Sequence, residues 1–473
     1  MRLLDGFTTK LPPSGNKNRV RFNKRLGIGV IQMDKSLWGL DINNKDHLVF
    51  GGCDVVDLAR EYGTPLFLID ENRVRTNYHR FLNAFNKHYT ETQVFYSYKT
   101  NCIPAILKTL HEEGCGAEVV SPYEFWLAHQ LGIESSRIIY NGVNKLKEDL
   151  MTAIQKGVGL INVDSLNEIK LLKMVSSKIR RHVNVGVRIC PGSGWKAQFG
   201  IQNNRDNIIA IFKEMAESDF LDPCCLHVHF ITGIRNTSLH SAVIKEIVAL
   251  MNKLKEKLDL ELKYLDLGGG FGVPAVKTLS LPEMALYKIF GITPKEPDIS
   301  ECPSIEGFGE SITRCLINNL ERYRLKRPIL IFEPGRAITS DAQILLVTVG
   351  EIKKRKSGAS FAITDGGMQN IAFPLSFEYH RCFLANRCSA RIKDRYHVTG
   401  PLCSPEDLLY RNRRLPELKA GDILAIMDAG AYFTSFSNNF SFARPAVVLV
   451  KDGSHKIIRE RENYEYMTAL DRI

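Results

Sequence analysis

Long apolar runs are missing from this chain of 473 residues. No stretch of eighteen or more apolar residues occurs, and the N-terminus lacks the apolar segment of a signal peptide. The eleven cysteines are odd in number and show neither C-x-x-C pairs nor the His spacing of zinc sites. These absences argue against a membrane span, a secretory leader, a disulfide framework and a metal. They favour a cytoplasmic enzyme with free thiols.

The basic residues are not arranged for nucleic acid. The formal net charge is +11, and residues 1–27 hold +6 of it, with seven Lys and Arg residues against Asp5 alone. This segment contains Pro, Gly and Asn and is predicted to be a flexible basic leader. The remainder shows no basic stripe interleaved with aromatics, so we expect no nucleic-acid partner, while attraction of an acidic substrate or carrier stays open.

Strand and helix patterns alternate along the middle of the chain, which predicts the α/β class and a closed (β/α)₈ TIM barrel. Helical patterns fall between most of the candidate strands, for example over residues 122–131, 167–178, 208–217 and 241–258. The eight candidate strands are Val94–Tyr98, Ala117–Val120, Ile138–Tyr140, Leu160–Val163, Val183–Ile189, Leu226–Phe230, Tyr264–Leu267 and Ile329–Phe332.

The length of the chain suggests two domains. After Ala342 the pattern becomes β-rich, and short strands near residues 28–50 are expected to join it in one β-rich domain built from both chain ends. The predicted divisions are a leader at 1–27, N-terminal strands with an entry helix at 28–63, the barrel at 64–342 and a C-terminal β domain at 343–473. Residues 272–316 are predicted to be a long insertion over a site or partner surface.

One lysine stands where a strand pattern gives way to a helical one. Lys99 directly follows the strand pattern of residues 94–98, and the spacing of residues 105–110 is helical. The amine is therefore expected at the carboxyl end of a strand, where α/β barrels gather their chemistry. It is either a solvated strand cap or a partly desolvated amine that loses its proton and reacts covalently.

Histidine and glycine motifs follow two later strands. The segment His227–Thr232 contains either satisfied core histidines or a ring stacked on a flat cofactor, because a zinc site would need further ligands. Gly268–Gly270 directly follows a strand, so its backbone amides either approach a phosphate or form a tight turn. A dinucleotide-binding G-x-G-x-x-G motif is excluded, since it would require glycine at Val273.

Charged, thiol and phenol groups occupy three further turns. Glu333 could hold a pyridinium nitrogen protonated, and Arg336 could bind phosphate or carboxylate, unless the pair forms only a surface turn. Cys403 lies in a polar, Pro-containing loop where a thiol could exchange a proton, although most cysteines are buried and inert. Tyr432 follows a strand ending at Asp428, and its hydroxyl could reach a phosphate oxygen.

Together these motifs resemble one family. In chain order they read Y-x-x-K-x-N (Tyr96–Asn101), H-x-H, G-G-G, E-P-G-R, D-G-G-M (Asp365–Met368), G-P-x-C-x-x-x-D (Gly400–Asp407) and G-A-Y. Over residues 52–450 the chain resembles the pyridoxal-phosphate decarboxylases of the alanine-racemase-like fold, which include diaminopimelate, ornithine and arginine decarboxylases. Diaminopimelate decarboxylase looks nearest.

The resemblance implies a site for pyridoxal 5′-phosphate. Lys99 would hold the cofactor covalently, and His229 rather than His227 would stack on its ring. Thr232 stands where the family usually has serine. The residues implied around the phosphate are Thr232, Gly268, Gly269, Gly270, Gly335, Arg336 and Tyr432.

The resemblance also implies a decarboxylase that works as a homodimer. Glu333 would pair with the ring nitrogen, which keeps the ring an electron sink and favours loss of CO₂ over racemisation. Cys403 would donate a proton after CO₂ has left, reaching the site from the second subunit of a two-fold dimer. The catalytic set implied is Lys99, His229, Glu333 and Cys403.

The residues implied to contact substrate depart from the family pattern. Ser404 replaces the acid that follows the loop cysteine and holds the distal ammonium of the substrate, and Phe373 and Phe377 replace the Arg and Tyr of R-P-x-L-Y. A buried ammonium without its counter-ion would lose several kcal/mol, roughly a thousand-fold in binding. Arg336 and Asp407 complete the predicted substrate contacts.

We therefore expect an amino acid whose far end is not an ammonium. The options are an amide conjugate, a carboxylate-bearing amino acid, or a carrier-tethered aminoacyl group of a secondary-metabolite or siderophore route. Glu118, where relatives have aspartate, and Ile231, where they have glycine, also set the pocket apart. The alternatives are decarboxylation of diaminopimelate or a basic amino acid, racemisation, and a silent homologue that regulates a partner.

Overall fold

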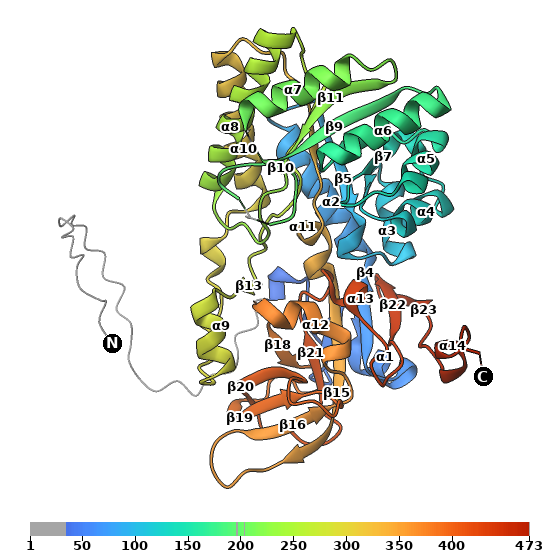
Figure 1. Cartoon of the computed structure of the whole chain (residues 1–473). Coiled ribbons are helices and arrows are strands. Elements are labelled where there is room, and N and C mark those ends of the chain that lie inside the picture. Colours follow the sequence, from blue (N-terminus) through green and yellow to red (C-terminus); the bar gives the residue numbers. More distant parts are fainter. Residues whose placement is uncertain (1–34, 195–196, 203, 473) are drawn as a thin grey trace, which may run out of the picture.

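A closed barrel of parallel strands forms the upper half of the molecule in Figure 1, a computed structural model that describes residues 35–194, 197–202 and 204–472. The eight barrel strands are β5 (Thr92–Ser97), β6 (Gly116–Val119), β7 (Ile138–Tyr140), β8 (Leu160–Val163), β9 (Val183–Cys190), β11 (Leu221–His227), β12 (Tyr264–Asp266) and β14 (Ile329–Phe332). Pairing of β14 with β5 and of β8 with β9 closes the ring, and the short β10 (Ile201–Gln202) extends the sheet beside β9. The predicted barrel is confirmed.

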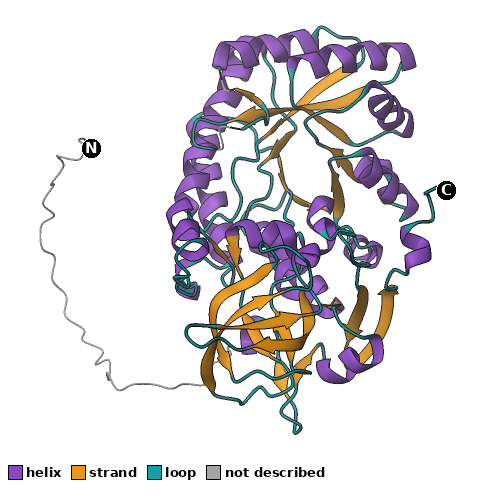
Figure 2. Cartoon of the chain, turned by 60° about the horizontal axis from the view of Figure 1, so that its bottom comes forward, coloured by secondary structure: helices purple, strands orange, loops and turns teal. Residues whose placement is uncertain are grey.

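Helices surround this barrel, as Figure 2 shows. They are α2 (Glu71–Asn86), α3 (Pro104–Glu112), α4 (Pro122–Gln130), α5 (Lys147–Lys156), α6 (Leu166–Ile179), α7 (Arg205–Ala216), α8 (Thr237–Leu258) and α10 (Ile305–Arg322), with the short α11 (Arg336–Thr339) after β14. Asp70, Ser121 and Ser165 cap α2, α4 and α6 by accepting backbone N–H groups that a first helical turn leaves free. No helix within the described ranges combines the length and hydrophobicity that a membrane span requires.

A second sheet forms the lower half of Figure 1. Its strands are β4 (Leu66–Asp70), β15 (Gln343–Lys353), β16 (Ser360–Thr364), β18 (Cys382–Leu384), β19 (Ile392–Thr399), β20 (Leu408–Pro416), β21 (Ile423–Ile426), β22 (Ala446–Lys451) and β23 (Ser454–Arg459). Their order is β20-β19-β16-β15-β4-β22-β23, while β21 pairs with β15 and β18. The helices here are α1 (Val55–Tyr62), α12 (Met368–Phe377), α13 (Phe433–Phe436) and α14 (Tyr464–Met467).

Segments from both ends of the chain build the core of this half. Trp38, Leu48 and Phe50 are fully buried in one cluster with Leu346 and Val448. The N-terminal strands β1 (Asp41–Ile42), β2 (Leu48–Phe50) and β3 (Cys53–Asp54) form a small sheet. The β-rich domain predicted from both ends is confirmed, whereas the predictions for the leader and for strand residues 28–33 concern residues outside the described ones.

The strand β4 belongs to the second sheet although the predicted boundary at residue 64 assigns it to the barrel. It pairs antiparallel with β15 and parallel with β22. A strand buried on both faces shows the same continuous apolar pattern in either setting, so the sequence could not separate the two. The division into domains stays a proposal, and we propose that the barrel begins at α2.

The predicted insertion at residues 272–316 contains ordered elements. β13 (Lys277–Thr278) pairs antiparallel with β17 (Glu378–Tyr379), α9 (Leu281–Lys288) follows, and residues 305–316 form the first turns of α10. The backbone N–H of Arg411 donates to the hydroxyl of Tyr287 at 2.8 Å, and Glu296 pairs with Arg413 at 3.1 Å. The insertion therefore reaches from the barrel to the second sheet and packs against it.

A buried histidine lies among aromatic rings of the barrel wall. His240 of α8 stacks on Phe271 with ring centroids 5.4 Å apart, and the edges of Phe230 and Phe308 lie within 5.7 Å. Within the described part of the chain neither ring nitrogen has a hydrogen-bond partner, and burial lowers the pKa of His240 to about 4. The fold therefore requires this ring to be neutral.

Acid should destabilise the protein partly through His240. An unfolded histidine has a pKa of about 6.5, so the folded state binds fewer protons below that value and stability falls as pH drops from 6.5 toward 4. In His240→Phe the free energy of unfolding, measured by urea titration, should fall by about 2 kcal/mol less than in the wild type between pH 6.5 and 4.5. The exposed His88→Gln is the control, and equal slopes in all three proteins would contradict the prediction.

Candidate functional site

The carboxyl ends of the barrel strands surround a cavity of about 420 Å³. Its walls include side chains that follow β5, β6, β7, β11 and β14, together with side chains from α12, α13 and the residue before α13. The predicted site residues that line it are Lys99, His229, Thr232, Glu333, Arg336, Phe377 and Tyr432. A narrow extension of about 20 Å³ adds Gly270 and Gly335. The structure thus gathers most of the residues that the motifs selected.

Lys99 lies just beyond β5, in a single 3₁₀ turn over Tyr98–Thr100. Its Nζ lies 2.6 Å from the Glu118 carboxylate and 2.6 Å from the Ser97 hydroxyl. Burial disfavours the charged amine, but attraction by Glu118 and Glu333 outweighs it and raises the pKa of Lys99. Desolvation alone would favour loss of the proton from the Lys99 amine. In this arrangement the protonated amine is favoured, because two carboxylates stabilise its charge.

An asparagine that the motifs missed connects the two carboxylates. Asn141 Nδ2 donates to Glu118 Oε1 at 3.0 Å and to Glu333 Oε1 at 2.6 Å. Its Oδ1 accepts a hydrogen bond from Asn162 Nδ2 at 2.9 Å, which fixes the orientation of the amide. Asn141 directly follows β7, so its position at the carboxyl end of a barrel strand was the available signal.

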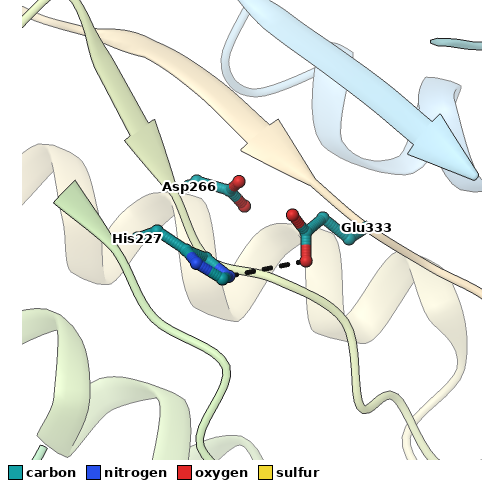
Figure 3. A group of neighbouring side chains, drawn as sticks. All are labelled: His227, Asp266 and Glu333. Carbon is teal, nitrogen blue, oxygen red and sulfur yellow. Dashed lines mark ion pairs between the residues drawn. The ribbon is translucent and has the colours of Figure 1, made fainter. Parts of the chain in front are cut away.

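Glu333, His227 and Asp266 form a buried group, shown in Figure 3, and Glu333 and His227 are part of the cavity wall. His227 Nε2 lies 3.5 Å from Glu333 Oε2. Burial raises the pKa of Asp266 well above its usual range and the charge of Glu333 raises it further, whereas His227 and Lys99 overcome burial and lower the pKa of Glu333. Glu333 is therefore the ionised member and Asp266 keeps its proton.

The same three side chains are close enough to meet a metal ion, since their ligand atoms lie within 4.8 Å of one another. Zinc sites use four ligands or three with water, and a ligating carboxylate must be ionised. The group offers one imidazole and two carboxylates, and the raised pKa of Asp266 leaves Glu333 as its ionised carboxylate when no metal ion is bound. The arrangement suits a single carboxylate that holds a proton or a cationic nitrogen.

The glycine turn after β12 lies against the neighbouring backbone. A Cβ atom on Gly269 would come within 2.3 Å of the Glu333 carbonyl oxygen, and one on Gly270 within 2.1 Å of the Ile231 carbonyl oxygen. The Gly269 N–H donates to His229 Nδ1 at 3.1 Å, and burial lowers the pKa of His229 to about 3. The turn therefore needs glycines, and it holds a neutral imidazole with a fixed tautomer.

Arg336 is buried and forms an ion pair that no motif indicated. Its Nη1 donates to Glu378 Oε2 at 3.0 Å and its Nη2 donates to Oε1 of the same carboxylate. Burial opposes this charge, but Glu378 raises the pKa of Arg336, and Arg336 with His380 lowers that of Glu378 to about 2. The guanidinium also faces the ring of Tyr432, at 5.5 Å from its centroid.

The loop around Cys403 lies apart from this cavity. Cys403 is exposed, and neither it nor Ser404 is among the described residues of the cavity wall. Asp407 accepts backbone N–H groups from Met368 at 2.6 Å and Leu402 at 2.7 Å, so its carboxylate is engaged in holding the loop. The prediction for Phe373 concerns a side chain outside the described ones.

Comparisons with known proteins agree with this site. The family model described as "Pyridoxal-dependent decarboxylase, pyridoxal binding domain" matches residues 72–340. A diaminopimelate decarboxylase of Methanothermobacter thermautotrophicus is 35% identical over 435 residues, which are 90% of this chain and 95% of that protein. That of Methanocaldococcus jannaschii is 29% identical over 442 residues, 89% of this chain and 94% of that one.

Solved structures show the same architecture. The crystal structure of the diaminopimelate decarboxylase of M. jannaschii with L-lysine has a TM-score of 0.80 at 28% identity and covers 92% of this chain and 98% of its own. A lysine/ornithine decarboxylase of Vibrio vulnificus with putrescine has a TM-score of 0.69 at 20% identity, covering 87% and 100%. At that identity the second likeness concerns the fold alone.

The close contacts of the glycine turn predict a large cost for a single methyl group. Gly270 has a φ of +87°, and its Cβ would strike a carbonyl oxygen, whereas Gly358 has a φ of +83° with open space around it. Gly358→Ala should cost about 1 kcal/mol in the free energy of unfolding, from backbone strain alone, and Gly270→Ala at least about 3 kcal/mol. Equal costs in urea titrations would contradict the close approach.

Proposed function

The chain belongs to the pyridoxal-dependent decarboxylase family and is an amino acid decarboxylase that uses pyridoxal phosphate, and on this premise we propose that Lys99 binds the cofactor covalently in the 420 Å³ cavity. The observation that carries the proposal is convergence: an amine, a bare glycine turn and an ionised buried carboxylate meet at one cavity. These groups come from three different strand ends, β5, β12 and β14.

The residues present fit the cofactor in three respects. Lys99 supplies the only kind of side chain that can bind an aldehyde reversibly as an amine. The Gly268 and Gly269 N–H groups already donate to Asp266 and His229, so Gly270, which lines the same space as Thr232, Arg336 and Tyr432, is the member of the turn that suits a phosphate. Glu333 is an ionised acid in a buried setting, which suits a protonated pyridine nitrogen.

When bound, the cofactor withdraws electrons from the amino acid carbon that loses CO₂. We assign to Glu333 the task of keeping a proton on the ring nitrogen, because Asn141 and His227 stabilise its charge. We assign to Glu118 the role of acceptor for the proton that Lys99 gives up before its amine can react, since the two groups are 2.6 Å apart. His229 offers a neutral ring face for stacking.

Cys403 is proposed to serve a second copy of the chain. It is exposed and lies outside the wall of this chain's own cavity, so it is not placed to protonate a product there. In a two-fold homodimer the same loop would reach the partner's cavity, and each site would then need both subunits. Thr232, Gly335 and Tyr432 are proposed phosphate contacts within one subunit.

The proposed substrate is an amino acid or amino-acid conjugate with an altered far end. Ser404 in place of an acid and Phe377 in the cavity wall leave no described carboxylate for a distal ammonium beyond those already paired. An amide conjugate or a carrier-tethered aminoacyl group fits this wall. Diaminopimelate is the second candidate, favoured by the 35% identity to a diaminopimelate decarboxylase, and a regulatory homologue without activity is the third.

The covalent attachment can be tested by absorbance. The purified protein incubated with pyridoxal phosphate should show a visible band that disappears on borohydride treatment, and Lys99→Ala should show none and release no CO₂ from any amino acid. Lys145→Ala is the control, because this buried lysine pairs with Glu168 outside the cavity wall. An unchanged band in Lys99→Ala would refute the assignment, and a colourless wild type would favour the regulator.

Replacing Asn141 should lower the rate of the reaction more than it lowers the stability of the cofactor-free protein. Removing its amide takes a donor from two buried carboxylates, and hydrogen bonds to charged groups are worth about 1.5–3 kcal/mol. We expect kcat to fall roughly 10- to 100-fold in Asn141→Ala, with a smaller change in KM. Asn77→Ala is the matched control, since Asn77 is buried and donates to Asp341 and to the Ile338 carbonyl. Similar kcat values in the two variants would contradict this role.

A further inference from the structure

Every lysine and arginine among the described residues of the cavity wall already has a carboxylate partner. The three pairs are Lys99–Glu118, Arg188–Asp164 and Arg336–Glu378. A charged group in a buried site is held well only when an opposite charge remains to balance it. The wall therefore offers no uncompensated cation to a substrate carboxylate.

Among these cations, Arg336 has the partner with the largest effect on whether a substrate carboxylate can bind. Both terminal nitrogens of its guanidinium bind Glu378, so the terminal donor pair is occupied, while the buried Nε has no hydrogen-bond partner among the described residues. Glu378 is itself buried, and His380 Nε2 lies 3.0 Å from its Oε2, which strengthens the hold on that carboxylate. A substrate carboxylate that bound both terminal nitrogens of Arg336 would have to displace Glu378 and leave that acid buried beside it.

The remaining wall is apolar where the cavity opens. Phe377 lines it, and Phe436 and Val143 are 46% and 43% exposed there. The Arg188 guanidinium lies over the ring of Phe199, 4.7 Å from its centroid. Such a surface favours a neutral substrate end over either charge.

The insertion of residues 272–316 fixes both Phe377 and Glu378. The Leu279 N–H donates to the Phe377 carbonyl at 2.8 Å, and Thr278 lies opposite Glu378 in the β13–β17 ladder. Arg235, three residues after Thr232, donates to the carbonyl oxygens of residues 273, 274 and 276 at 3.0–3.2 Å. The insertion therefore braces one wall of the cavity.

We propose that Glu378, held by this brace, is a specificity-determining residue that neutralises Arg336 and restricts the enzyme to amino acids whose side chain ends in a neutral group, such as an amide. The inference rests on the proposed decarboxylase function and narrows its substrate class. It excludes the carboxylate-bearing option and leaves the amide conjugate and a neutral carrier linkage. Glu378 acts through Arg336 and does not itself touch the reacting atoms.

Paired ligands of equal shape test the proposal. Glutamine against glutamate, and 2-aminoadipate 6-amide against 2-aminoadipate, would be titrated as both enantiomers into the holoenzyme while the absorbance of the bound cofactor reports binding. The wild type should bind each ω-amide at least tenfold more tightly than the matching acid. Glu378→Gln should lower that ratio at least tenfold, mainly by tighter binding of the acid to the released arginine.

Glu296→Gln is the matched control, since Glu296 also pairs with two arginines, Arg381 and Arg413, on the second sheet. Its amide-to-acid ratio should equal that of the wild type. A wild type that prefers the acid, or that binds none of the amides up to their solubility, overturns the proposal without need of a variant. So does an unchanged ratio in Glu378→Gln.

The same variant also tests whether Arg336 binds the phosphate of the cofactor. If Glu378→Gln binds pyridoxal phosphate more tightly while pyridoxal is unaffected and the amide-to-acid ratio stays constant, Arg336 serves the phosphate and the inference fails. Failure of the proposed function looks different, because the wild type would then show no bound-cofactor band at all. If the wild type binds the cofactor but prefers the acid to the amide, only the proposed substrate class is refuted.

Discussion

The balance of buried charge around Lys99 is the constraint on which the rest of the site depends. One amine on a side chain that is 37% exposed lies near two carboxylates and a protonated aspartic acid, and all three acids are buried. Each charge in such a group needs a partner, because an unpaired buried charge is costly. Asn141 links Glu118 to Glu333 and Asn162 fixes the Asn141 amide, while Asn162 Oδ1 and both ring nitrogens of His227 have no hydrogen-bond partner within the described part of the chain. The barrel strands hold all these groups in register.

The barrel could be predicted from the sequence because its strands are short apolar runs separated by amphipathic helices. Eight such repeats are typical of a (β/α)₈ barrel. Two strand ends differ from the prediction: Tyr98 lies in the turn that carries Lys99, and the strand predicted to end at Phe230 ends at His227. Hydrogen bonding decides such ends, and a residue's own propensity does not reveal it. β4 was misplaced for a related reason, since burial on two faces looks alike in either sheet.

Most of the site residues selected from motifs lie around one cavity, whereas the residues that pair with them could not be predicted from the sequence. Lys99, His229 and Glu333 each follow a strand, and the barrel alone brings strand ends together. The link from Arg336 to Glu378 depends instead on a two-residue ladder between an insertion and a segment a hundred residues later. Pairing of that kind is set by tertiary packing, so no local pattern signals it. Roles for Cys403, Ser404 and Asp407 remain predictions.

The dependence of the cavity on Tyr432 has a consequence for how the protein is made. Tyr432 lines the cavity, and its backbone N–H donates to the Thr100 carbonyl at 2.8 Å. The strand β4 pairs with β15 and β22, which come much later in the chain. A ribosome exposes Lys99 long before it has translated these later segments. The nascent chain can therefore assemble barrel strands early, yet it completes the reactive chamber only near the end of synthesis. Loading with the vitamin-derived group is in this way coupled to a finished polypeptide.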